Sequence, residues 1–268
     1  MSLKILKKPL LFLSSILSFF NTGCSEDPDL FVKDDSSDQT QSPSDNNASE
    51  MFSESILVFS KTAGFRHASI EKGVQLIMDL GAQNNFLVEH SEISSDINAE
   101  NLSKYEVVVF LNTTGDILDA NQQIIFERYI QAGGSFMGVH AAADTEYDWP
   151  WYGQLVGAYF ESHSDVTSAD SEIVIEDHAA TEKLPMVWSR TDEWYNFKTV
   201  YEEINVLLNL DERTYQGGLM GENHPIAWYH EFDGGRSFYT GGGHTETSYD
   251  EPDFQNHLLG GILYCLAR

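Results

Sequence analysis

Basic residues and cysteines are scarce in this chain of 268 residues. It holds 15 Lys and Arg against 42 Asp and Glu, and it has two cysteines, Cys24 and Cys265. The net charge of −27 opposes binding to nucleic acids and to anionic membrane surfaces, because both carry negative phosphates. We therefore expect no nucleic-acid partner. If Cys24 carries a lipid, Cys265 has no partner for an intrachain disulfide, and we expect it in the core.

The apolar run near the amino terminus, from Leu10 to Phe20, is shorter than the ~20 residues that a bilayer span requires. Three lysines precede the run, and the small residues Thr22 and Gly23 stand directly before Cys24. Residues 1–23 therefore predict a secretory signal peptide. The residues before Cys24 resemble a bacterial lipobox, although Asn21 stands where Leu is usual, so we expect a lipid anchor at Cys24 and a periplasmic or surface-exposed place in the cell envelope. An ordinary secreted protein is the alternative.

Residues 24–53 are dominated by Ser, Asp, Asn, Gln and Glu. Such a segment buries too little apolar surface to offset the entropy of ordering. We expect it to be a disordered acidic tether, which leaves residues 54–268 as one globular domain. Removal of the three signal-peptide lysines takes the net charge of the mature chain to about −30.

Short apolar runs alternate with helical patterns in the first half of this domain. Strands are predicted at 56–60, 86–89, 107–111 and 135–139, and helices at 67–80 and 119–132. Further strands are expected at 172–175, 206–210, 226–230 and 236–240, before a closing helix at 253–266. This order predicts an α/β fold with a doubly wound, mainly parallel (mixed) sheet flanked by helices. Ligands of such sheets bind at the carboxyl ends of the strands.

Three predicted strand ends lead into polar loops, at 61–67, 112–116 and 140–145. Their candidate functional side chains are Arg66, His67, Thr114, Asp116, His140 and Asp144. His140 follows its strand at a sharp turn, the place where other enzymes project a nucleophilic Ser or Cys. An imidazole there favours acid–base, metal or hydrogen-bonding roles over acyl transfer. Turn glycines and helix caps are the alternative explanation of these loops.

Histidines are plentiful in the domain, but none stands in a tight metal spacing such as HExxH. Ligands that are far apart in the sequence can still meet in the folded chain. A divalent ion such as zinc, bound by His140 and His163, is therefore one hypothesis for the cofactor. Structural roles are expected instead for His178, His230 and His257.

Aromatic residues cluster at 147–152 and 193–197, beside carboxylates and amides. Flat rings stack on the C–H face of sugars, so Trp149, Trp151 and Trp194 are predicted to contact a carbohydrate ligand. Core packing is the alternative, because Trp and Tyr suit it equally well.

Eight segments in order resemble the trehalose-utilisation ThuA-like family, from about residue 56 to residue 268. They are KTAGFRH (61–67), NTTGD (112–116), GGSFMGVHAAADT (133–145), WPWYGQLVGAYFESH (149–163), DEWYNF (192–197), HPIAWYHE (224–231), GRSFYTGGGHTE (235–246) and FQNHLLGGILY (254–264). The resemblance implies a fold similar to class I glutamine amidotransferases. His140 stands where those enzymes have their nucleophilic Cys, so glutaminase activity is not implied.

The family resemblance also implies a role in carbohydrate metabolism, notably the handling of 3-keto-glycosides that partner sugar oxidoreductases produce. Many exported members are described as secreted glycosyl hydrolases. We therefore expect an enzyme that cleaves glycosides or 3-keto-glycosides, with His140, His67, Asp116 and Glu193 as catalytic residues and His244 among those that contact substrate. Two alternatives remain: a carbohydrate-binding lipoprotein without activity, and a hydrolase that uses two carboxylates.

Overall fold

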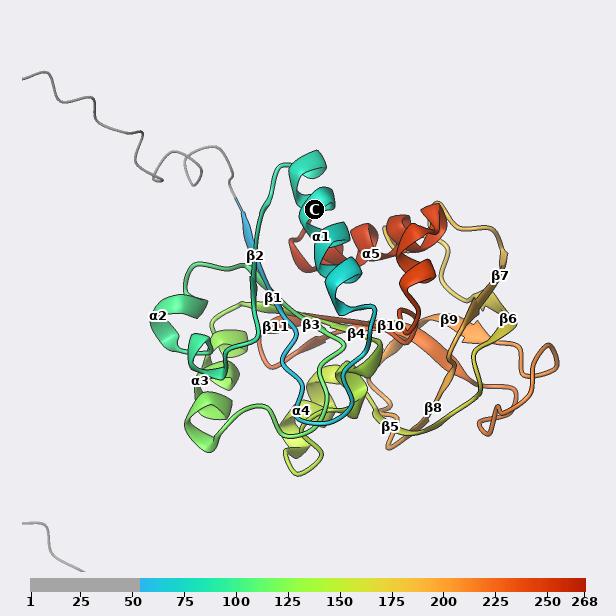
Figure 1. Cartoon of the computed structure of the whole chain (residues 1–268), viewed down its shortest axis with the longest axis horizontal. Helices are drawn as coiled ribbons and strands as arrows, with labels where there is room; N and C mark the ends of the chain where they lie inside the picture. Colours follow the sequence, from blue (N-terminus) through green and yellow to red (C-terminus); the bar gives the residue numbers. More distant parts are fainter. Residues whose placement is uncertain (1–53) are drawn as a thin grey trace, which may run out of the picture. The chain divides into compact units, whose positions relative to one another are not determined.

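The structure is a computed structural model that describes residues 54–268 (Figure 1). The predicted signal peptide, Cys24 and the tether lie outside the described residues. The strands are β1 Ser55–Phe59, β2 Leu87–Ser91, β3 Val107–Leu111, β4 Ser135–Val139, β5 Tyr159–His163, β6 Thr167–Ile173, β7 Val187–Asp192, β8 Tyr195–Lys198, β9 Asn205–Leu210, β10 Pro225–Phe232 and β11 Gly235–Thr240. The helices are α1 Ile70–Asn84, α2 Ala99–Leu102, α3 Ala120–Gln131, α4 Pro150–Val156 and α5 Pro252–Cys265.

A nine-stranded sheet in the order β2-β1-β3-β4-β11-β10-β9-β6-β7 forms the framework of the domain. Strands β2, β1, β3, β4 and β11 run parallel, whereas β10, β9, β6 and β7 continue the sheet in antiparallel pairs. The expected α/β fold with a mainly parallel, mixed sheet is therefore confirmed. A separate antiparallel pair, β5 and β8, aligns His163 with Tyr195.

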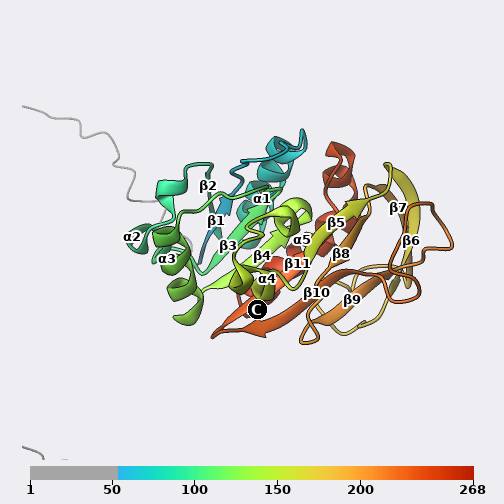
Figure 2. The ribbon, with the colours of Figure 1, turned by 90° about the horizontal axis from the view of Figure 1, so that it is seen from below.

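Helices cover both faces of the parallel half of the sheet. Helices α1 and α5 lie on one face, and α2, α3 and α4 lie on the other (Figures 1 and 2). Because both faces are covered, every residue of β3 and β4 is buried, and their continuous apolar sequences suit this environment. Cys265 at the end of α5 is buried and free, as expected for a core residue.

The strand–helix boundaries follow local sequence signals. Asp119 and Gln122 form the complete capping box that begins α3. Asn85 ends α1 in the left-handed conformation, with φ 62°. After the sharp turn at His140, the chain forms a five-residue 3₁₀ helix, His140–Asp144.

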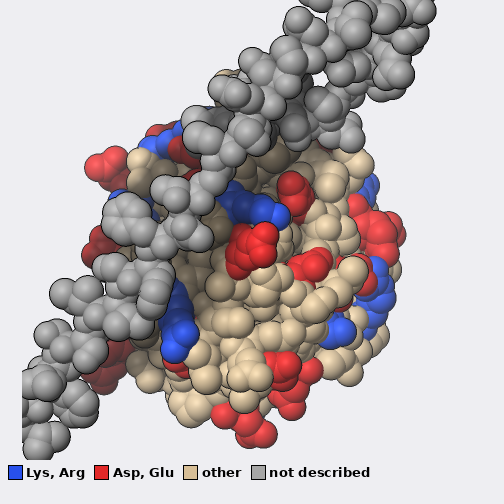
Figure 3. Space-filling model, turned by 90° about the vertical axis from the view of Figure 1, so that its left-hand side faces the viewer, with Lys and Arg blue, Asp and Glu red and all other residues tan. Residues whose placement is uncertain are grey.

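The surface at the β2 edge of the sheet carries acidic and basic side chains in small, separate groups (Figure 3). Within residues 54–268, no helix has both the length and the apolar character needed to span a membrane.

Candidate active site

Three polar loops meet at the carboxyl ends of β1, β3 and β4, as the predicted topology requires. Isolated parallel bridges join Thr62 to Thr114 and Gly115 to Thr145. The Thr114 hydroxyl also donates a hydrogen bond of 2.9 Å to the carbonyl of Phe65. These contacts hold the loops as one rim, and they give the predicted ligand residue Thr114 a structural role.

His140 occupies a strained turn directly after β4. Its φ of 49° lies in the left-handed region, which is uncommon for residues other than glycine, and its side chain is fully buried. The Tyr239 hydroxyl donates to the His140 carbonyl at 2.8 Å. The ring Nδ1 lies 2.8 Å from the Gly241 carbonyl, which only accepts, so Nδ1 carries the proton. This contact turns Nε2 toward Glu193, 3.6 Å from Oε2.

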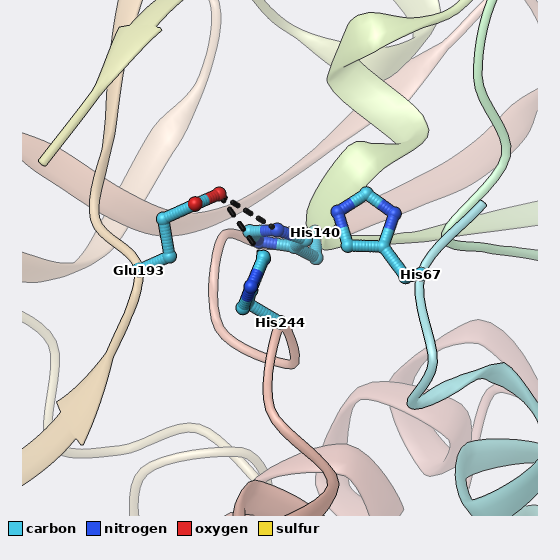
Figure 4. A group of neighbouring side chains, drawn as sticks. All are labelled: His67, His140, Glu193 and His244. Atoms are coloured by element: carbon cyan, nitrogen blue, oxygen red, sulfur yellow. Dashed lines mark ion pairs between the residues drawn. The ribbon is translucent and has the colours of Figure 1, made fainter. Parts of the chain in front are cut away.

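Four side chains from separate parts of the fold form one compact group, which we call the histidine–glutamate group (Figure 4). It consists of His67 after β1, His140 after β4, Glu193 between β7 and β8, and His244 after β11. One nitrogen or oxygen from each lies within 4.8 Å of the others. His244 Nδ1 lies 3.1 Å from Glu193 Oε2. Nitrogen and carboxylate donors of this kind could hold a divalent metal ion.

The group has well-defined charges. Burial favours a higher pKa for Glu193, but its contacts with His140 and His244 outweigh burial and hold the pKa far below its usual range. The same contact with Glu193 raises the pKa of His244 against the effect of burial. Burial first, and then repulsion from His140 and His244, lowers the pKa of His67 to about 3. Glu193 is therefore a carboxylate and His67 is neutral near pH 7.

Asp192 connects the backbone segments that carry Glu193 and His244. This fully buried carboxylate accepts the backbone N–H of Glu193 at 3.0 Å and that of His244 at 3.1 Å. It also accepts the N–H of Gly243 at 2.8 Å and the hydroxyl of Ser248 at 3.0 Å. Asp192 therefore fixes the β7–β8 link and the loop after β11 in one relative position.

Arg190 balances the buried charge of Asp192. Its guanidinium lies 3.0 Å from Asp192 and over the rings of Trp188, Trp194 and Phe254. The indole of Trp194 is buried and donates to the Thr167 carbonyl at 3.0 Å. Trp194 was predicted to contact a sugar, but its ring packs in the core because it completes this cage around Arg190.

Trp149 and Trp151 also lie away from the histidine–glutamate group. Their rings stack on each other at 5.2 Å and pack against Phe126 of α3. Their indole N–H groups donate to Glu127 and Asp233. These contacts join α4 to its neighbours, so the structure gives the two rings a packing role, and their predicted contact with a carbohydrate stays a prediction.

His163 and Asp144 stand beside the group. His163 is half-exposed, and its Nδ1 lies 3.1 Å from Oε1 of Glu193, the oxygen that does not face His140. Asp144 accepts the Tyr147 hydroxyl at 2.6 Å. Burial raises the pKa of Asp144, although Tyr147 and His140 oppose the shift. His163 thus contacts Glu193 directly, and Asp144 interacts electrostatically with His140.

Two further candidates, Arg66 and Asp116, lie on the exposed part of the rim. Arg66 pairs with Glu71 at 2.8 Å and with Glu92 at 2.9 Å, and all three side chains are exposed. Asp116 is exposed and follows the Gly115 turn.

The sequence reasoning missed the aromatic wall of the site and the role of Asp192. The ring of Tyr195 lies 4.2 Å from that of His140, and Phe160 lies 4.3 Å from Tyr195. Tyr195 belongs to the aromatic cluster at 193–197, from which Glu193 and Trp194, but not Tyr195, were predicted as site residues. No sequence signal distinguishes Asp192 from the exposed acids.

The fold and the site define an α/β protein with a histidine–carboxylate centre at the carboxyl rim of its sheet. Residues 55–265 match the model of the ThuA family, trehalose utilisation, and the chain belongs to this family. A comparison with curated protein sequences gave no match.

Solved structures share the fold at low sequence identity. A ThuA-like protein from Bacteroides uniformis superposes with a TM-score of 0.69 at 20% identity, over 80% of this chain and 92% of that chain. A ThuA-like protein from Parabacteroides merdae gives a TM-score of 0.67 at 18% identity, over 80% and 91%. A β-galactosidase from Bacillus circulans gives 0.53 at 14% identity, over 79% of this chain and 31% of that chain.

Proposed function

We propose that this chain is a carbohydrate-acting enzyme that cleaves 3-keto-glycosides at the histidine–glutamate group. The observation that carries the proposal is the convergence of His67, His140, Glu193 and His244 at the ligand-binding rim of the sheet. Membership of a trehalose-utilisation family supports a carbohydrate substrate.

The chemistry of a 3-keto-glycoside matches the groups available. The carbonyl at C3 acidifies the proton at C2, so a base removes that proton, a C1–C2 double bond forms, and the C1–O bond to the leaving group breaks with its electron pair. The leaving oxygen then takes up a proton. This elimination needs a base and a group that stabilises negative charge on the C3 oxygen. Asp144 and His163 are the candidate bases, and the histidine–glutamate group polarises the carbonyl.

The test is turnover of a panel of 3-keto-glycosides by the purified full chain, with the parent glycosides in parallel. Asp144→Asn removes a base and is expected to lower kcat by about 100-fold or more. Asp148→Asn, a matched change at an exposed position of the same loop, should leave kcat within a few-fold. Absence of turnover on every 3-keto-glycoside would refute the proposal, and saturable sugar binding without turnover would favour a carbohydrate-binding protein.

The cellular setting is part of the same proposal. A signal peptide and a lipid on Cys24 would place the domain in the cell envelope, where a partner sugar oxidoreductase would supply the 3-keto group. The prediction of this setting rests on the sequence of residues 1–53.

A further inference from the structure

We propose that His67, His140, His244 and Glu193 bind one divalent transition-metal ion, with zinc as the reference ion. The inference deepens the proposed function, since it names the cofactor of the same site. Its geometry and its test do not depend on any substrate.

The orientation of His140 is the first argument. Because Nδ1 donates its proton to the Gly241 carbonyl, Nε2 is the ring atom left to bind a ligand. This atom is buried, has no hydrogen-bond partner among the described residues, and lies 3.6 Å from a carboxylate oxygen of Glu193. Two electron-pair donors that face each other repel unless a proton or a cation lies between them. A backbone carbonyl that fixes the far nitrogen is also the usual arrangement around a metal-binding histidine.

The spacing of the donors is the second argument. Bonds of about 2.0–2.1 Å to zinc place neighbouring tetrahedral ligands roughly 3.4 Å apart. The two nitrogen–oxygen separations at Glu193, 3.1 Å to His244 and 3.6 Å to His140, lie on either side of this value.

His67 supplies the third argument. Its side chain is only 4% exposed. Its ring stands nearly perpendicular to those of His140 and His244, with centroids 4.9 Å and 5.1 Å away. Three histidine rings that converge in this way, with a carboxylate opposite His67 (Figure 4), surround a common point rather than stack as a hydrophobic core does.

A second shell holds the ligand-bearing segments. Asp192 accepts the backbone N–H groups of both Glu193 and His244. Ser69 and Asn112 donate to the Gly243 carbonyl at 3.0 Å and 3.2 Å, which ties the loop after β11 to the rim near His67. Outer contacts of this kind tune metal affinity, commonly by 10–100-fold.

The test begins with the purified full chain, stripped with a chelator and reloaded with zinc, manganese or nickel ions. Elemental analysis is expected to find about one ion per chain and a higher Tm in the loaded protein, because an ion that binds only the folded state stabilises it. Glu193→Gln and His244→Ala should lose the ion and the metal-dependent rise in Tm. His90→Ala, a histidine on β2 that pairs with Ser60 instead, should keep both.

Asp192→Asn provides a graded variant. It leaves all four proposed ligands in the chain, so it should still bind the ion, but about 10–100-fold more weakly. Circular dichroism of each metal-free variant shows whether a loss of binding reflects unfolding.

Two results would overturn the metal site: a wild-type chain that takes up no stoichiometric ion, or a folded His244→Ala variant that binds as tightly as wild type. A chain that binds the ion and turns over no 3-keto-glycoside would contradict the proposed function alone. Undiminished turnover by the metal-free chain would contradict the role of the ion as a cofactor of the reaction and leave the proposed function in place.

Discussion

Single residues at the strand ends carry the strain of the site. His140 has φ 49° and Asn112 has φ 52°, although neither is a glycine. Such backbone costs about 1–3 kcal/mol unless the surroundings offset it. At Asn112 the offset is visible, because its buried amide donates to Ser69 and to the Gly243 carbonyl. The side chains of these two strained residues hold or form the site.

The buried residue His257 is predicted to make the free energy of unfolding sensitive to acid. His257 is fully buried, Nδ1 donates to the Ala180 carbonyl, and burial lowers its pKa from 6.5 to about 4. The unfolded chain therefore binds a proton below pH 6.5 that the folded chain refuses until about pH 4. Stability should fall through this window by roughly 3 kcal/mol on account of His257.

Urea unfolding of the wild type and of His257→Gln between pH 7.5 and pH 4 measures this contribution. The variant loses packing against Trp188 and Phe254, so it should be less stable at pH 7.5, but its stability should fall less steeply with pH. An equal fall in both proteins would show that His257 is not a source of the acid sensitivity.

The chemistry of the site residues was predictable to different degrees. His67 and His140 follow buried strands, so topology alone places them on one rim. Glu193 was predicted as a catalytic residue and His244 as a substrate contact, but their approach to the rim depends on the antiparallel half of the sheet. Asp192 gave no signal, because its partner Gly243 lies 51 residues further along the chain.

At the scale of the element, the start of α3 can be tested directly. The Asp119 side chain accepts the N–H groups of Asn121 and Gln122, and Gln122 returns a bond to the Asp119 N–H. Asp119→Ala should lower the free energy of unfolding by about 1 kcal/mol. Asp116→Ala, at an exposed position just before the helix, should change it by less than about 0.5 kcal/mol in the same urea titration. Equal effects would contradict the assigned cap.

Strands of the two halves of the sheet differ in how clearly their sequences predict them. The parallel strands β1, β3 and β4 are continuous apolar runs, and their predicted bounds were close to those observed. Strand β7 was missed, although its residues alternate between exposed and buried. Two of its buried residues, Arg190 and Asp192, are charged and form an ion pair. The sequence therefore does not show the alternation of apolar and polar residues that predicts a strand.

At the scale of the whole molecule, the site lies where the parallel and antiparallel halves of the sheet join. Strand β4 leads to His140, the adjacent β11 leads to His244, and the far edge strand β7 leads to Glu193. The parallel half could be predicted as a unit because each strand needs only its own apolar run. In the antiparallel half, β9 and β10 were also predicted as strands, but the pairing of β6 with β7 and β9 is long-range and has no local signature in the sequence.

Membrane attachment of the domain is predicted to depend on the lipid anchor at Cys24. If Cys24 carries lipid, Cys24→Ala should move the protein from the membrane fraction to the soluble fraction, because the acidic chain has no electrostatic attraction to anionic lipid. The metal content and turnover of the released protein should equal those of the wild type, since all four proposed ligands lie in the domain. Fractionation followed by immunoblotting measures the shift. Membrane retention of Cys24→Ala would show that attachment does not depend on this cysteine.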